Sequence, residues 1–538
     1  MTASGVGGSG GVVMGSTPVT DRQSGSTTES AEINFLEAVP AIDRSPKLSE
    51  DDRVKKLQPL MPNLPIVYWQ ENKKKKVPKN NTSCTKFPDI YDLHFNNKYW
   101  QVLESSNGSF YLYGAYLDVR ANNRLGPTVR VLGMINRLEP QVKTQCQLWF
   151  SDSPGTEPVV SKVLEYKYIW YKKWGNYKQG LFQPYLLACQ LPKTHWGKTP
   201  VSVSIVENKC DKATNNLRVT YNKPEEGEGK KKFAVCVKGL SYPTEDISIR
   251  LIEWIELLHA LGADTIYFYV LHVHENIKKA LDYYEAENWI DVKNTTYPTY
   301  FPNMPLAEVP SYLKKHIHAK RQWELLPYND CFYRNLYLYD YIALLDIDEV
   351  IMPSMNYSSW ELMMEAAVNT SLRVRNITRA SYNFKTVYFL DEMQPKSLAN
   401  IPDYLHMMQH VVRSSDVIKP KNYYDKSFFN PEKVLLVHNH TPLACLGGGV
   451  SGVGPAPDVF CISHPVSGEL GLVQHYRRDC APSLAARCPG YKARTIVDYN
   501  IWRWRQPVMA GALRAINTLG LLENKNKSSN SFDFIHPK

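Results

Sequence analysis

The chain has 538 residues, of which 43% are hydrophobic and 22% are charged, as in a globular protein with room for two or three domains. The formal net charge is +10, but seven positive charges lie in two short runs, Lys73–Lys76 and Lys230–Lys232, which are typical of solvated linkers. We therefore do not expect a nucleic-acid-binding protein.

Residues 1–62 are predicted to be a disordered tail or stem, because they are poor in hydrophobic residues and begin with a stretch rich in Gly, Ser and Thr. Their start contains no apolar run typical of a signal peptide or a membrane anchor. The longest uncharged run, 434–457, is interrupted by glycine, proline and histidine, and would make a poor membrane helix. We expect membrane attachment only through an anchor that is not visible in this sequence.

Residues 63–222 are predicted to form a β-rich accessory domain. Short apolar and aromatic runs, rich in residues that favour strands, are separated there by turn residues. Examples are 110–119, 129–134 and 146–150. The polar, glycine-containing segment 223–232 is the expected linker to a second domain.

Residues 233–520 change to a rhythm of strands and helices, followed by a polar tail over 521–538. A helix with apolar residues from Ile247 to Leu258 and a stop at Gly262 is predicted after the first strand. Alternation of strands and helices at these lengths is typical of a parallel α/β sheet. The predicted strands are 233–237, 265–271, 289–292 and 341–345, with helices over 275–287 and from 312 to about 339.

Two carboxylates follow the last of these strands, at Asp346 and Asp348. Residues i and i+2 of a strand share a face, so we expect the two side chains to converge and Glu349 to point to the other face. At the carboxyl edge of a parallel sheet, such a pair can hold a divalent cation, magnesium or manganese, that bridges to phosphate oxygens. A bound metal there would stabilise a departing diphosphate.

Other interpretations of this segment remain open. The pair could be a solvated acidic loop. Residues 346–350 also fit the haloacid-dehalogenase-type phosphatase pattern, with Asp346 as nucleophile. That family completes its metal site with a later acidic pair, and the only Asp-Asp here is Asp51-Asp52 near the start of the chain. A further alternative is a non-catalytic glycan-binding protein.

Four stretches together resemble glycosyltransferase family 92. Its members include β-1,4-galactosyltransferases and have a GT-A-type, Rossmann-like nucleotide-sugar-binding domain, which we expect here over residues 233–520. The resemblance covers roughly residues 231–515. It is carried by 233–240, by 251–256 with 261–269, by 329–334 leading into the acidic pair, and by 434–438 with 474–477.

The resemblance implies an inverting hexosyltransferase that moves galactose from UDP-galactose to a glycan acceptor, with Mn²⁺ or Mg²⁺ as cofactor, in the Golgi membrane or lumen. Nine Asn-x-Ser/Thr sites and ten dispersed cysteines also favour a secretory lumen. The even cysteine count permits disulfides without fixing their connectivity. Cys236 and Cys331 match family positions, which suggests structural thiols or a bridge.

By the same resemblance, Asp346 and Asp348 should contact the metal and the diphosphate. His475 is the first choice for a further metal ligand, with His438 and His440 as competitors. Arg477 could pair with a phosphate or with an acidic neighbour.

An inverting transferase also needs a general base, normally a carboxylate. The sequence does not choose between four candidates downstream of the acidic pair, which are Asp391, Glu392, Asp425 and Glu432.

Overall fold

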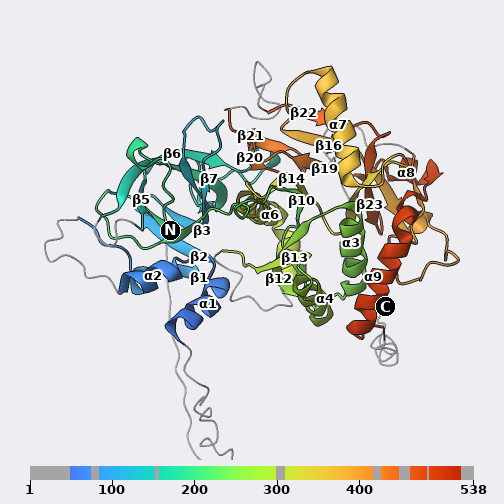
Figure 1. The fold of residues 1–538 in the computed structure, drawn as a ribbon, viewed down its shortest axis with the longest axis horizontal. Coiled ribbons are helices and arrows are strands. Elements are labelled where there is room, and N and C mark those ends of the chain that lie inside the picture. The colour runs from blue at the N-terminus through green and yellow to red at the C-terminus, as the bar shows by residue number, and fades with distance from the viewer. Residues whose placement is uncertain are drawn as a thin grey trace, which may run out of the picture. The chain divides into compact units, whose positions relative to one another are not determined.

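The computed structural model describes residues 49–73, 84–151, 157–298, 309–415, 426–447, 461–480 and 484–522. Contacts divide the chain into two compact units, Met1–Asp52 and Arg53–Lys538. The described residues form a mixed α/β structure with several sheets (Figure 1). None of the described helices combines the length and the apolar character that a membrane crossing requires.

Helix α1 (Glu50–Leu60) lies within the segment 1–62 that we expected to be disordered. The hydroxyl oxygen of Ser49 accepts a hydrogen bond from the backbone N–H of Asp52 at 3.1 Å, as an N-cap residue does. This cap, followed by helix-forming Lys, Gln and Leu residues, accounts for the helix despite the low hydrophobicity of the segment. Helix α2 (Ile66–Lys73) follows. Residues 1–48 and 523–538 of the two expected tails lie outside the described residues.

Nine strands between residues 95 and 220 form one sheet in the order β1-β2-β3-β4-β7-β6-β5-β8-β9. Neighbours in this order are antiparallel, and β3 also pairs in parallel with β9, at Ala115 and Val219. Because that pairing joins the ends of the run from β3 to β9, seven strands close into a barrel. The strands are β1 (Phe95–Asn97), β2 (Trp100–Ser105), β3 (Gly108–Asp118), β4 (Thr128–Ile135), β5 (Gln145–Trp149), β6 (Val159–Tyr168), β7 (Gln183–Gln190), β8 (Ser202–Val206) and β9 (Leu217–Thr220), with short helices η1 (Ile90–Asp92), η2 (Lys172–Trp174) and η3 (Lys193–His195).

From residue 231 the chain builds the parallel sheet that the sequence predicts. Strands β10 (Lys231–Cys236), β12 (Thr265–Val273), β13 (Ile290–Asn294) and β14 (Tyr339–Leu344) lie in the order β13-β12-β10-β14. The connections therefore run one way from β10 to β12 and β13, and then return to place β14 on its other side. In open α/β sheets, ligands bind at the carboxyl ends of the strands where the order reverses in this way. That point lies here between β10 and β14.

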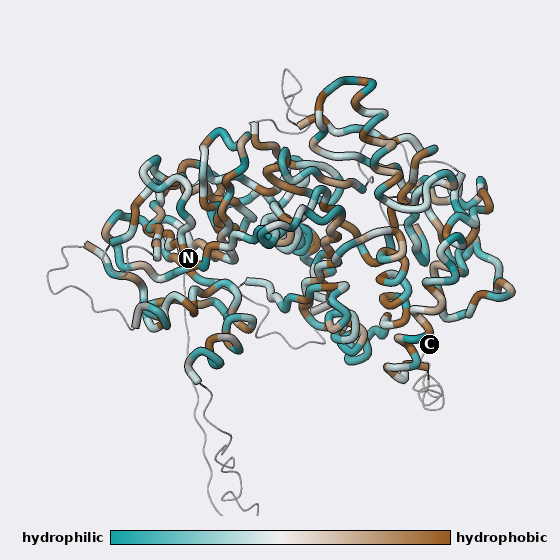
Figure 2. Tube along the Cα trace, viewed as in Figure 1, coloured by the Kyte–Doolittle hydropathy of each residue, from teal (hydrophilic) through white to brown (hydrophobic). Residues whose placement is uncertain are grey.

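Helices α3 (Ser248–Leu261) and α4 (Glu275–Ala286) connect these strands. Gly262 ends α3 in the left-handed region, with φ 110°, which confirms the predicted stop signal. In Figure 2 the tube over α3 is largely brown, which marks hydrophobic residues, and the tube over α4 is mostly teal, which marks hydrophilic ones. This agrees with their burial, because α3 is buried along much of its length whereas α4 buries one face. Helix α9 (Arg505–Thr518) packs beside α3 (Figure 1).

Helix α6 (Ile317–Arg334) covers the opposite face and packs against both the parallel sheet and the barrel. Its Asp330 is buried and accepts hydrogen bonds from the hydroxyls of Tyr116 on β3 and Tyr269 on β12. Arg334, one turn later, pairs with the same carboxylate at 2.8 Å. The barrel and the parallel sheet are thus joined through one buried side chain of α6.

The remaining elements extend the parallel sheet and form further small sheets. Strands β19, β16 and β22 continue the sheet beyond β14, and β15, β23 and β17 form a separate three-stranded sheet. These elements are β11 (Leu240–Tyr242), α5 (Val309–Lys315), β15 (Glu349–Pro353), α7 (Trp360–Val374), β16 (Ser381–Phe384), β17 (Thr386–Leu390), η5 (Asp391–Met393), β18 (Val412–Ser414), β19 (Lys426–Phe429), β20 (Val434–Val437), β21 (Pro442–Cys445), β22 (Ser463–Pro465), β23 (Gly471–Arg477), α8 (Cys488–Ala493), β24 (Thr495–Val497) and η8 (Asn500–Trp504).

All ten cysteines are paired, in five disulfides. The bridge between Cys236 at the end of β10 and Cys331 in α6 confirms the expectation that these two residues are structural, and it ties the sheet to the helix that covers it. The other pairs are Cys84–Cys210, Cys146–Cys189, Cys445–Cys461 and Cys480–Cys488.

Candidate functional site

A cavity of about 360 Å³ opens where β10 and β14 end, at the reversal of strand order. Three segments contribute to its walls. Lys238 and Gly239 follow β10, Asp346 and Asp348 follow β14, and β23 contributes its last residues, among them His475 and Arg477. The structure therefore brings four of the predicted site residues, Asp346, Asp348, His475 and Arg477, into one cavity.

The acidic pair lies in a turn between β14 and β15. Strand β14 ends at Leu344, and the backbone N–H of Glu349 donates to the carbonyl oxygen of Asp346 at 2.9 Å. The two carboxylates therefore do not occupy alternate positions of one strand, as we had expected. The carboxyl edge of the sheet is nevertheless where the prediction placed them.

Asp346 is surrounded by cations. Its Oδ1 lies 3.0 Å from Nζ of Lys238 and its Oδ2 lies 3.7 Å from Nζ of Lys426. The Tyr328 hydroxyl also donates to Oδ1 at 3.2 Å. Burial by itself would raise the pKa of Asp346, but the charges of Lys238 and Lys426 outweigh burial and hold the pKa far below its usual range. This carboxylate is therefore ionised and already partly neutralised by lysine.

Asp348 is paired with His475. The Oδ2 atom of Asp348 lies 3.2 Å from Nε2 of His475, and Nδ1 of the same ring lies 3.5 Å from the Glu349 carboxylate. Burial lowers the pKa of His475, but the two neighbouring carboxylates outweigh burial and raise the pKa above its usual value. Burial raises the pKa of Asp348, but the charge and the hydrogen bond of His475, together with the charge of Lys238, outweigh burial and hold the pKa below its usual value.

Glu349 belongs to the same cluster, contrary to the expectation that it would point to the other face. Its carboxylate accepts the backbone N–H of Asp346 at 3.0 Å and pairs with the fully buried Lys426 at 2.7 Å. The turn after β14 rotates the chain, so strand alternation no longer separates neighbouring side chains. Burial raises the pKa of Glu349.

These contacts indicate which side chains could hold a cation. Asp348 and His475 contact each other at the cavity wall, and an oxygen with an imidazole nitrogen forms a donor pair suited to a divalent metal. Asp346 pairs instead with Lys238 and Lys426, so its charge would act beside the ion. The residues fit a cation held by Asp348 and His475.

The other predicted histidines lie elsewhere. His438 follows β20, is buried, and packs on Trp174 with 4.6 Å between ring centroids. Burial lowers its pKa to about 3. The His440 carbonyl oxygen accepts the Ser427 hydroxyl at 2.8 Å. Neither histidine is among the described residues that line the cavity, so of the three histidines only His475 reaches it.

Arg477 lines the cavity, and its Nε donates to the carbonyl oxygen of Asp479 at 3.2 Å. That bond uses one nitrogen of the guanidinium and involves a backbone oxygen, not a carboxylate. Arg478 and Arg250 line the same cavity. The cavity therefore combines an acidic cluster on one wall with several basic side chains.

The four residues predicted as candidates for the general base lie in different parts of the chain's fold or outside its described residues. Asp391 and Glu392 line a second cavity of about 540 Å³, which shares Ile247, Arg250 and His406 with the first. Glu392 also pairs with Lys492 at 2.7 Å. Glu432 lines another cavity and pairs with Lys230 at 2.6 Å, and Asp425 lies outside the described residues.

Sequence reasoning missed Lys238, Lys426 and His406. Lys238 had a usable signal, because it directly follows a predicted strand at the edge where ligands of α/β sheets bind. Lys426 and His406 had none as single residues, since nothing nearby in the sequence shows that β19 and the turn at 406–409 approach this cluster.

The family model described as Glycosyltransferase family 92 matches residues 231–508, just over half of the chain. The match begins at the first residue of β10 and ends within α9, so it contains both cavities. No match was found among curated proteins.

Proposed function

The chain belongs to glycosyltransferase family 92, and from this premise we propose that it transfers a hexose, galactose in the first instance, from a UDP-sugar to a glycan acceptor with inversion at the anomeric carbon. The observation that carries the proposal is the cavity at the reversal of strand order, with Asp348 and His475 in contact on its wall. Proteins that share a fold can use different substrates, so family membership does not identify the donor sugar. Galactose is therefore part of the proposal.

We propose a GT-A-type arrangement for residues 233–520. The order β13-β12-β10-β14 supports this, since nucleotides bind at such a reversal in Rossmann-like sheets. In this arrangement the nucleotide end of the donor occupies the first cavity. The barrel of residues 95–220 would be an accessory domain joined to it.

The diphosphate of the donor would meet basic side chains in the first cavity. Lys238 and Arg477 both line it, and Arg478 adds a further guanidinium. Guanidinium groups bind phosphate oxygens with paired hydrogen bonds, and an ammonium group binds them as a point charge. Because Lys238 now pairs with Asp346 at 3.0 Å, binding of a diphosphate would draw it into a shared network.

Asp348 and His475 would hold the cation, Mn²⁺ or Mg²⁺, with the negative charge of Asp346 close by. When bound, such a cation acts as a Lewis acid that stabilises the charge developing on the departing nucleoside diphosphate. Glu349 and Lys426 neutralise each other at 2.7 Å behind this pair and fix the turn that carries it.

The acceptor would enter from the second cavity, which adjoins the first through Arg250 and His406. A carboxylate there, Asp391 or Glu392, would take the proton of the acceptor hydroxyl. The hydroxyl oxygen then bonds to the anomeric carbon as the bond from that carbon to UDP breaks. Of the two carboxylates, Glu392 is engaged with Lys492 and Asp391 with two histidines.

The contacts of Asp346 bear on the phosphatase alternative. A phosphatase would need Asp346 as a free nucleophile, whereas its carboxylate contacts Lys238 and Lys426. The family match gives that alternative no support.

Residence in the Golgi remains part of the proposal, and the five disulfides support it because such bridges persist in oxidising compartments.

The deciding experiment is donor turnover by purified protein with a panel of UDP- and GDP-sugars, with Mn²⁺ or with chelator. We expect metal-dependent turnover of UDP-galactose that Asp348→Ala reduces by about 10³-fold. The matched control is Asp340→Ala, a partly exposed carboxylate of β14 that pairs with Lys232 at 3.3 Å. Well-folded protein that turns over no donor, even with glycan acceptors present, would favour the non-catalytic glycan-binding alternative.

A further inference from the structure

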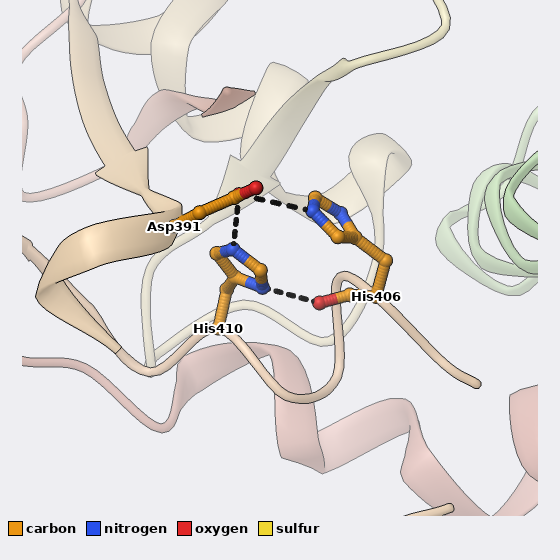
Figure 3. A group of neighbouring side chains, drawn as sticks. All are labelled: Asp391, His406 and His410. Carbon is orange, nitrogen blue, oxygen red and sulfur yellow. Dashed lines mark hydrogen bonds and ion pairs between the residues drawn. The ribbon is translucent and has the colours of Figure 1, made fainter. Parts of the chain in front are cut away.

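Asp391, His406 and His410 form a compact group on the wall of the second cavity (Figure 3). The Oδ1 atom of Asp391 lies 3.2 Å from Nε2 of His406 and 2.9 Å from Nε2 of His410. Among the described residues there is one other such set, Asp479 with Cys480 and Cys488, whose cysteines are bridged to each other.

The hydrogen bonds of this group cannot all form unless one further positive charge, a proton or a metal ion, is present. Nδ1 of His410 faces the carbonyl oxygen of His406 at 2.5 Å, and a carbonyl oxygen can only accept, so Nδ1 carries a proton. In a neutral ring, Nε2 then has a lone pair, which points at the Asp391 carboxylate. Two acceptors that face each other repel. A further proton shared by His410 and Asp391, or a metal cation bound by both, would remove this repulsion.

The surroundings favour a prepared metal site. Histidines that bind metals usually donate their other ring N–H to a backbone carbonyl or a carboxylate, as His410 does here. The turn that carries both histidines is held in place, because the carboxyl group of Glu253 accepts the backbone N–H groups of Met407 and Met408 at 3.0 and 2.8 Å. Ligands held this firmly are arranged before an ion arrives.

We propose that Asp391, His406 and His410 bind a divalent transition-metal ion of the zinc class. Two imidazoles and one carboxylate suit zinc better than magnesium or manganese, and three protein ligands leave a position open. All three side chains line the second cavity, so the open position faces it. Arg250 lines the same cavity and its charge opposes a cation, so binding depends on the charge of Asp391.

This site is separate from the Asp348 and His475 pair, and the proposal does not rest on the transfer reaction. It gives Asp391 a role other than that of general base. The sequence signal is the four-residue spacing of His406 and His410, which puts two side chains on one side of a helical turn.

The test measures metal content and needs neither donor nor acceptor. The full chain is purified without a metal-affinity tag, and bound metals are determined by mass spectrometry before and after extraction with chelator. The extracted protein is then titrated with Co²⁺, whose visible absorption reports tetrahedral coordination. We expect about one equivalent of zinc in the native protein and a Co²⁺ spectrum that Zn²⁺ abolishes but excess Mn²⁺ does not.

Variants assign the site. The double substitution His406→Ala and His410→Ala should weaken Co²⁺ binding by at least about 100-fold, whereas Asp348→Ala should leave it unchanged. His272→Ala, which removes an exposed histidine of β12, is the matched control. Retention of the Co²⁺ spectrum by the double variant would overturn the proposal.

Absence of tight metal from folded native protein, with no Co²⁺ spectrum, would also overturn it and would assign the extra charge to a proton within this group. If the double variant fails to fold, the titration of extracted native protein still decides. A transferase without this metal would refute only this inference, and a metal-bound protein without turnover would refute only the proposed function.

Discussion

The Nε2 atom of His475 lies 3.2 Å from Oδ2 of Asp348, a residue 127 positions away in the sequence. The antiparallel register of β15 with β23 brings them together, because it sets Glu349 opposite His475 and lets the N–H of Tyr476 donate to the Asp348 carbonyl at 2.8 Å. Backbone pairing therefore positions the two side chains that we assign to the cation.

Substitution of His475 tests that assignment. We expect His475→Gln to raise the Mn²⁺ concentration needed for half-maximal turnover by about 100-fold, because the change removes one of two principal ligands. The measurement is donor turnover against metal concentration. His464→Gln, in β22 of the larger sheet, is the control and should leave the metal requirement unchanged. An unchanged requirement in His475→Gln would remove His475 from the metal site.

Lys426 should be important for stability. Its side chain is fully buried and pairs with Glu349 at 2.7 Å, so Lys426→Met leaves a buried carboxylate without its cation. We expect the free energy of unfolding to fall by about 3–5 kcal/mol in chemical denaturation. Lys385→Met, at an exposed position between β16 and β17, should change it by less than about 0.5 kcal/mol. Equal effects of the two substitutions would contradict this account.

Stability should fall with rising pH because of Glu253. Burial raises the pKa of this α3 carboxyl from 4.5 to about 7, so between these values the folded protein keeps a proton that the unfolded chain has released. Its contribution is fully present below pH 4.5 and is lost as pH passes about 7. The loss is on the order of 3 kcal/mol. Glu253→Gln should flatten the pH dependence of the free energy of unfolding, and an unaltered slope would assign the effect to other groups.

The bridge between Cys236 and Cys331 should stabilise the sheet against α6. Replacing both residues with alanine removes a cross-link over 95 positions, and we expect a loss of about 2–4 kcal/mol in the free energy of unfolding. Peptide mapping under non-reducing conditions checks the pairing itself. If either cysteine is found bridged to another partner, the arrangement of β10 and α6 described above is wrong.

Gly511 permits the close packing of α9 on α3. A Cβ atom at this position would collide with the carboxylate of Glu256, which is itself fixed by the Tyr284 hydroxyl at 2.7 Å. Gly511→Ala should therefore lower the free energy of unfolding by about 1–3 kcal/mol despite its better helix propensity. Gly229→Ala, where an added Cβ meets no atom within 4 Å, is the control. A stabilised Gly511→Ala protein would show that Glu256 moves aside without cost.

Local signals predicted the elements of the parallel sheet well. The apolar run 341–345 predicted β14, and Gly262 predicted the end of α3, because each depends on neighbouring residues alone. The acidic pair was found for the same reason, as polar residues that follow a buried strand. Helix α1 was missed although Ser49 gives a cap signal, since low hydrophobicity was given more weight.

Relationships between distant segments could not be predicted. The partner of each cysteine, the approach of Lys426 to Asp346, and the turn that brings His406 and His410 to Asp391 depend on the order of strands in the sheets. Glu349 was misplaced because strand alternation was extended past Leu344, where the strand ends. Spacing along the chain contains no information on such contacts.

Helix α6 also sets a limit on how the chain can be divided. The family match starts at residue 231, yet the apolar side chains of α6 pack against Tyr116 and Leu132 of the barrel, and Asp330 accepts a hydrogen bond from Tyr116. A fragment cut at residue 231 would expose that apolar surface and leave a buried carboxylate short of a donor. The start of the family match at residue 231 is thus not the start of a unit that folds by itself. We expect soluble expression of residues 231–508 to require that the barrel is kept in the same chain.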